Sequence, residues 1–185
     1  MAYRPRTRIW TPAALTVGAV TLSNLKAHLR ITSSAEDAII TDYGIAATAA
    51  VERWTQRIIA PRVATLSLQE LPLRKCPIEL PGGTIISLTS VIADAVTITG
   101  CTTIGHSPAL LFPALDWPTV TGDGYPVTIT YEVGMATIPQ DLSHAVKLMV
   151  GEMYERRANA VEGPLNQTLI SAEYLMASHR IWAAA

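Results

Sequence analysis

The most regular hydrophobic pattern in the chain is helical and lies between Glu36 and Pro61. On a wheel of 100° per residue, one narrow apolar stripe contains Ile40, Tyr43, Ala47, Val51, Trp54 and Ile58. The opposite side is mixed, because Ile45 and Ala49 stand where charged side chains would face solvent. The pattern predicts a helix over 36–58 that packs on more than one side, and Pro61 disfavours its continuation.

Two further segments carry a helical stripe. Over 21–31 the stripe consists of Leu22, Leu25 and Leu29, with Thr21 or Ser23 as the N-cap. After Pro139, which suits a first helical position, the apolar residues are Leu142, Ala145, Val146, Met149 and Met153. The last segment, 165–185, is helix-prone but apolar around most of the wheel, and such a helix is expected to be enclosed by other elements.

The middle of the chain has the composition that is typical of β-strands. Between Arg62 and Val133 the segments VATLSLQEL, CPIELP, TIISLTSVIA, AVTITG and VTITYEVG are rich in Val, Ile and Thr and are bounded by Pro, Gly or Asp. We expect five or six short antiparallel strands, with an irregular loop over 100–123 that contains a short strand at ALLF.

The order of these elements predicts an α+β fold in which a small antiparallel β subdomain is inserted into a helical bundle. The expected parts are an arm or extended lead-in over 1–20, a helical core over 21–61 and 137–160, a β-rich subdomain over 62–136, and a C-terminal helix over 161–185.

Composition indicates a protein whose surface is covered by partners. Hydrophobic residues make up 49% of the chain, mean hydropathy is +0.27, and charged residues make up 16%, against about 25% in typical soluble domains. No apolar run reaches the length of about 18 residues that indicates a membrane helix, and the N-terminus lacks the apolar stretch of a signal peptide. We therefore expect a cytosolic protein that buries surface in an assembly.

The charge balance disfavours tight binding to nucleic acid. The net charge is −1, whereas proteins that grip phosphates have a basic excess. Eleven Arg stand against three Lys, which fits protein interfaces better than a solvated surface. Arg4, Arg6 and Arg8 could touch phosphates, but a solvated or protein-docking arm is the favoured interpretation.

Candidate chemistry is sparse. The sequence has no phosphate-binding loop, dinucleotide fingerprint, zinc-protease motif or serine elbow. The histidines His28, His106, His144 and His179 are scattered, Cys76 and Cys101 fit reduced, partly buried thiols, and turn or cap roles explain Asp123 and Asp141. We expect no enzyme activity, no cofactor and no metal.

The ordered set of segments resembles a known family. LKAHLR at 25–30 is followed by WTQR at 54–57, Tyr131 with Gly134, YERR at 154–157 and HRIW at 179–182. This set, spread over residues 21–182, resembles the head–tail connector (adaptor) proteins of long-tailed bacteriophages and of related gene transfer agents. One departure is Gln56, where the family often has glycine, and the loop at 100–123 does not align.

The resemblance implies a structural subunit of the particle neck, made in the host bacterial cytoplasm. About a dozen copies would form a homo-oligomeric ring below the portal protein, and the ring would extend the DNA channel without binding DNA specifically. A stopper or tail protein would bind the opposite side. The C-terminal segment would dock on the portal, through Tyr174, Leu175, Met176, His179, Arg180, Ile181 and Trp182. Candidate contacts between subunits are Ile45, Ala49, Arg53, Arg156 and Arg157.

Three alternatives remain open. The chain could be a different neck protein, such as a stopper or a tail-completion (terminator) protein. An enzyme with an unrecognised site is disfavoured by the missing motifs, and a small DNA-binding module is disfavoured by the charge balance.

Overall fold

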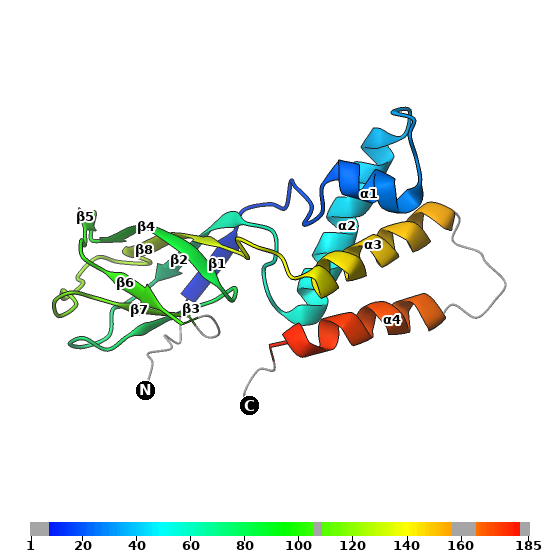
Figure 1. Ribbon diagram of the computed structural model, residues 1–185. Helices are drawn as coiled ribbons and strands as arrows, with labels where there is room; N and C mark the ends of the chain where they lie inside the picture. The colour runs from blue at the N-terminus through cyan, green and yellow to red at the C-terminus, as the bar shows by residue number, and fades with distance from the viewer. Residues whose placement is uncertain (1–7, 106–108, 157–165, 182–185) are drawn as a thin grey trace. The chain divides into compact units, whose positions relative to one another are not determined.

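The computed structural model describes residues 8–105, 109–156 and 166–181 (Figure 1). For residues 166–170 it describes the backbone only. The chain divides into two compact units. The β unit comprises Met1–Ala14 and Pro61–Ala136, and the helical unit comprises Leu15–Ala60 and Thr137–Ala185. The α+β class predicted from the sequence is confirmed.

The described residues of the β unit form two antiparallel sheets (Figure 1). The larger sheet has the order β1-β2-β8-β4-β5, with strands at Arg8–Pro12, Arg62–Leu68, Val127–Val133, Ile85–Ala93 and Val96–Thr97. The smaller has the order β3-β7-β6, with strands at Ile78–Leu80, Ala109–Phe112 and Thr102–Ile104. The antiparallel strands expected from the sequence are present, and β1 and β6 are additional.

Strict alternation along the central strands places the core on one face of the larger sheet. In β2 and β8 the buried residues are Ala64, Leu66, Leu68, Val127, Ile129, Tyr131 and Val133. The register pairs Leu66 with Ile129, so the buried positions of neighbouring strands share a face. The residues between them include Thr65, Ser67, Thr128 and Thr130, which are half-buried and polar.

Strand β1 lies within the segment for which the sequence predicts an arm or extended lead-in. Its Trp10 is paired with Leu66 of β2. Its five residues are too few to show a period of two, and Pro12 is tolerated because β1 is an edge strand. The turn before β4 lies close to β1, because a Cβ on Gly82 would be 3.1 Å from Trp10 Cζ2. The same turn is bound to β8: the Tyr131 hydroxyl donates to the Pro81 carbonyl at 3.0 Å, and burial raises the pKa of Tyr131 above its ordinary range.

Within its described residues the helical unit contains four helices and a short 3-10 turn (Figure 1): α1 (Leu22–Leu29), α2 (Asp37–Thr55), α3 (Gln140–Glu155), α4 (Asn166–Met176) and η1 (Ala177–His179). Helix α3 packs against α1, α2 and α4. Thr21 caps α1 as predicted, because its hydroxyl accepts the Asn24 N–H at 3.4 Å. Of the predicted α1 stripe, only Leu25 is buried.

Small residues in α2 serve close packing inside the helical unit. A Cβ on Gly44 would lie 2.8 Å from Leu25 Cδ1, and one on Gly18 would lie 3.1 Å from the Gly44 carbonyl oxygen. Thr48 accepts the Ala19 N–H at 2.9 Å. The segment before α1 and α1 itself therefore both lie against α2, and this explains why the helix is apolar or small on more than one side.

The end of α2 differs from the prediction. The helix stops at Thr55, so Ile58 is buried in the following loop rather than in the helix. Gln56 occupies the cap with a φ of 57°, the left-handed conformation that favours glycine. Its amide donates to the Arg53 carbonyl at 2.7 Å.

Glu52 holds the chain that leaves α2. The wheel places it on the mixed side of the helix, yet it is buried. Its Oε1 accepts the N–H groups of Ile59 at 2.8 Å and Ala60 at 3.1 Å. A carboxylate is thus the acceptor for two buried backbone donors that no helix or strand satisfies.

Candidate interface surfaces

The C-terminal segment, expected to dock on a partner, lies against its own helical unit. Ala172 and Met176 are buried, and Leu175 is half-buried. Tyr174 is 84% exposed. The two helical faces are thus separated: one fills the core of the unit, and Tyr174 points away from it.

An acidic side chain of α3 binds η1. His179 Nε2 lies 2.5 Å from Asp141 Oδ2. Burial acts to raise the pKa of the Asp141 carboxyl, but hydrogen bonds from His179 and from the Leu142 N–H outweigh it and lower the pKa below its ordinary value of 3.8. The interaction therefore favours the ionised carboxylate.

Two more contacts hold the residues after η1 on α2. The Ile181 N–H donates to the Thr55 carbonyl at 2.9 Å. The Arg180 guanidinium lies 5.2 Å from the centre of a Trp54 ring, within range of a cation–π interaction. Four of the seven predicted docking residues, Met176, His179, Arg180 and Ile181, thus contact their own unit. Trp182 lies outside the described residues.

Removing the Asp141 carboxylate should loosen this attachment. We expect Asp141→Asn to speed amide hydrogen exchange at Ile181 about five-fold at neutral pH, the effect of losing one modest hydrogen bond. Because the pKa of Asp141 is lowered in the folded chain, its contribution is complete above about pH 4 and is lost as pH falls through that lowered pKa. The measurement is the rate of amide exchange at Ile181 as a function of pH, corrected for the intrinsic effect of pH on exchange. The control variant Glu173→Gln, on an exposed residue of α4, should change neither the rate at neutral pH nor its pH dependence.

The predicted contacts between subunits lie on two helices. On α2, Ile45 and Ala49 are half-buried and Arg53 is exposed, so this side is only partly covered by the unit itself. At the end of α3, Arg156 is half-buried, and its guanidinium lies 3.5 Å from Glu152. Arg157 lies outside the described residues.

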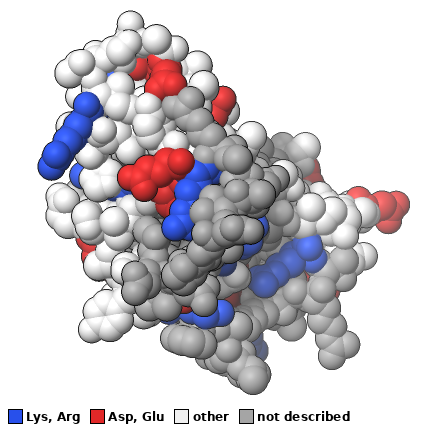
Figure 2. Space-filling model, turned by 90° about the vertical axis from the view of Figure 1, so that its right-hand side faces the viewer, with Lys and Arg blue, Asp and Glu red and all other residues white. Residues whose placement is uncertain are grey.

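Charged side chains are few on the described surface. On the face drawn in Figure 2, Lys and Arg side chains alternate with Asp and Glu side chains among larger uncharged areas. No basic stripe of the kind that tracks a nucleic-acid backbone is visible among the residues coloured there.

The structure brings His28 of α1 and His144 of α3 together, with ring centres 6.1 Å apart and edge-to-face. Burial lowers the pKa of His28, and the nearby His144 and Lys147 lower it further.

Over the described ranges, no group of three or more His, Cys, Asp or Glu side chains could hold a metal ion. Cys76 and Cys101 are half-buried thiols, and burial raises the pKa of Cys101. His106 falls outside the described residues.

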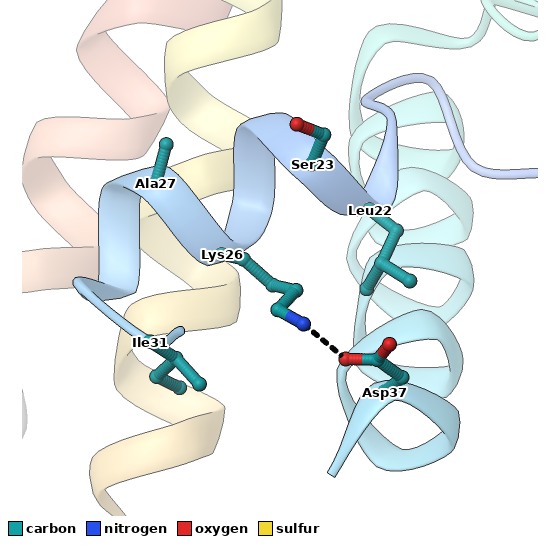
Figure 3. Close-up of a pocket in the computed structure, with 6 residues that line it drawn as sticks. All are labelled: Leu22, Ser23, Lys26, Ala27, Ile31 and Asp37. Carbon is teal, nitrogen blue, oxygen red and sulfur yellow. Dashed lines mark hydrogen bonds and ion pairs between the residues drawn. The ribbon is translucent and has the colours of Figure 1, made fainter. Parts of the chain in front are cut away.

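A shallow hollow of about 450 Å³ opens between α1 and the start of α2 (Figure 3). Its lining residues are Leu22, Ser23, Lys26, Ala27, Ile31 and Asp37. Lys26 Nζ of α1 binds Asp37 Oδ1 of α2 at 2.6 Å, and Figure 3 shows this ion pair between Leu22 and Ile31. In the part of the chain that the structure describes, no helix has the length and apolarity to cross a membrane.

Solved chains from gene transfer agent (GTA) particles are similar in fold to this chain. A chain from the neck of an empty GTA particle, computed with C6 symmetry, superposes with a TM-score of 0.75 at 22% identity, over 96% of this chain and 97% of that one. A chain from the neck of a native GTA particle, computed with C12 symmetry, gives 0.74 at 19% identity over the same shares. A chain from the virion of a native particle gives 0.72 at 21% identity, again over the same shares.

The chain shares the fold of these particle chains. The likeness covers both units, because almost the whole length of each chain is matched. No protein-family model matches the sequence, and no curated protein matches it.

Sequence reasoning missed two features of these surfaces. It did not separate the exposed Tyr174 from the buried Met176, because a helix apolar all round gives no preferred face. It also missed the hollow of Figure 3, which needs α1 and α2 to be placed side by side. The pairing of Lys26 with Asp37 has no signal in local spacing.

Proposed function

We propose that this protein is an adaptor subunit of a particle neck, which forms a ring below the portal and joins the capsid to the tail. The observation that carries the proposal is the full-length likeness to neck chains of GTA particles, across both the helical and the β unit. The order of the segments in this sequence, from LKAHLR at 25–30 to HRIW at 179–182, supports the adaptor position within the neck. The role is structural and requires no catalytic group.

A ring made of identical subunits needs two different complementary surfaces on each copy. The side of α2 that carries Ile45, Ala49 and Arg53 is one such surface, because its own unit covers it incompletely. The near-neutral charge supports a channel through which DNA slides, since a basic lumen would retain the phosphates. The DNA passes through the ring as cargo.

The C-terminal segment is the portal-docking element in this proposal, and Tyr174 is its exposed anchor. Its side chain is large, 84% exposed and carried on a helix whose opposite face is fixed by Ala172 and Met176. A tyrosine presented in this way loses little conformational freedom on binding, which is the property of residues that dominate interfaces.

The test is binding of the purified full chain to the purified portal ring encoded with it. We expect Tyr174→Ala to weaken this binding by about 30-fold, equivalent to about 2 kcal/mol. Val17→Ala is the matched control, because Val17 is a 72% exposed apolar residue of the same unit and should leave the affinity unchanged.

A wild-type chain that never binds portal would overturn the adaptor function. Equal affinities for wild type and Tyr174→Ala would remove Tyr174 from the docking surface and leave the remaining C-terminal residues to be tested.

A further inference from the structure

Two histidines face one another where α1 packs against α3. The rings of His28 in α1 and His144 in α3 lie edge to face, with their centres 6.1 Å apart. A Cβ built on Gly151 would lie 3.8 Å from His28 Nε2, so the His28 ring lies along the surface of α3 that carries both residues. An edge-to-face pair of aromatic rings is attractive, and the two neutral imidazoles therefore help to hold α1 on α3.

A third cation stands beside the pair. Lys147 lies one turn further along α3 than His144, and its positive charge acts on His28. Burial, His144 and Lys147 all lower the pKa of His28 from its ordinary value of 6.5. If both rings took up protons, three positive charges would meet at this contact.

The carboxylates that reach these helices are engaged elsewhere. Asp37 of α2 reaches α1, but it is bound to Lys26 at 2.6 Å. Asp141, one turn before His144 on α3, is bound to His179. Neither carboxylate is therefore held by the histidine pair.

Two further carboxylates share a hollow of about 180 Å³ with His28. Glu152 and Glu155 line it together with Arg156. Glu152 is bound to Arg156 at 3.5 Å, and Glu155 is exposed to solvent, which screens its charge. The pKa of His28 is lowered and not raised, so the cations outweigh these carboxylates.

We propose that the α1–α3 contact is an acid-sensitive switch, in which protonation of His28 and His144 releases α1 from α3 below about pH 6. Contacts to α2 keep α1 on the unit, because Leu25 lies against Gly44 and Lys26 stays paired with Asp37. The released state uncovers the surface of α3 that His28 covers. Both histidines belong to one chain, so the switch operates whether or not a ring forms.

The direction of the pH effect follows from proton affinity. His28 binds a proton less tightly while α1 is packed than after its release, so the packed state is fully favoured above the ordinary pKa of 6.5. Its advantage is lost as the pH falls from 6.5 through the lowered pKa. Solvent screens both rings, and charges at this separation should then shift the equilibrium about five-fold.

Amide hydrogen exchange of the full chain at about pH 7.5 and about pH 5 measures the release, after correction for the intrinsic effect of pH. An eight-residue helix is marginal without its packing, so protection at Leu29 reports the contact of α1. We expect this protection to fall about five-fold at the lower pH, while Val51 of α2 keeps its own. Both pH values lie above 3.8, the ordinary pKa of Asp, so the Asp141 carboxylate stays ionised.

Two variants at one position isolate the cause. His144→Asn removes a titrating ring, so it should abolish the pH difference at Leu29 and return the pKa of His28 toward 6.5 in an NMR titration. His144→Lys places a permanent charge there and should give the lower protection already at about pH 7.5. The control Arg30→Gln, on an exposed residue after α1, should keep the wild-type pH difference.

Three results would overturn the switch. The first is an equal pH difference in wild type and His144→Asn. The second is protection at Leu29 that stays constant or rises at the lower pH, as attraction of His28 to Glu155 would produce. The third is a loss that extends equally to Val51, which would show that the whole unit is destabilised.

Discussion

Glu52→Ala is expected to lower the free energy of unfolding of the helical unit by about 3 kcal/mol. The substitution removes the acceptor of the Ile59 and Ala60 N–H groups and leaves both donors buried, at a cost of about 1–3 kcal/mol for each unsatisfied group. Chemical denaturation followed by circular dichroism measures the change, since the helices dominate that signal.

Two variants control this result. Both N–H groups bind the same oxygen, Oε1, so Glu52→Gln keeps an acceptor in place and should cost clearly less than alanine. Glu155→Ala, on an exposed residue of α3, should stay within about 0.5 kcal/mol of wild type. A loss in Glu52→Ala no larger than that in Glu155→Ala would show that the buried carboxylate does not organise the loop.

Gly82→Ala should destabilise the β unit by about 3 kcal/mol or more, as the sum of backbone strain and overpacking. Gly82 has a φ of +104°, which side-chain-bearing residues rarely adopt. A Cβ there would lie 2.8 Å from Val133 Cγ2 and 3.1 Å from Trp10 Cζ2. Val133 is fully buried, so it has no room to move aside.

Gly124→Ala separates the two causes. Gly124 also has a positive φ, +77°, but no atom lies within 4 Å of a Cβ built there, so only the strain of about 1–2 kcal/mol should appear. Tryptophan fluorescence during chemical denaturation, in a background with Trp54→Phe and Trp182→Phe, reports on the β unit through Trp10 and Trp117. Equal losses in the two variants would contradict the close packing of β1 and the turn at Gly82 against β8.

The parts of the fold that depend on local pattern were predictable from the sequence. The stripe through Leu142, Ala145 and Val146 becomes the buried face of α3, and the alternation in 127–133 becomes β8. Both are periodic over enough residues for burial to select one face. The N-cap role of Thr21 follows from a side chain that satisfies an otherwise unpaired N–H.

The parts of the fold that depend on contacts between residues distant in sequence could not be predicted. Strand β1 exists because β2 offers it an edge, and nothing within residues 8–12 requires a strand. Glu52 resembles a surface residue until the chain after α2 folds back over it. The loop after β2 and the loop after β7 are far apart in sequence, and Trp117 joins them, because its indole N–H donates to the Cys76 carbonyl and its backbone N–H donates to the Arg74 carbonyl.

The docking residues show the same limit. The sequence marks the C-terminal segment as apolar all round, and the structure turns Met176 inward and Tyr174 outward. It also engages His179, Arg180 and Ile181 with α2 and α3. If the segment docks on portal through those residues, their contacts to Asp141, Trp54 and Thr55 must first break, and breaking them costs free energy. Docking through Tyr174 has no such cost, because its side chain is already exposed.

An image of the assembled particle neck, with this chain traced in it, tests the central claim most directly. The account predicts a closed ring of this chain directly below the portal, with Tyr174 against the portal and DNA passing through the lumen. A neck in which another protein occupies that position, while this chain lies further down the tail or outside the particle, would contradict it.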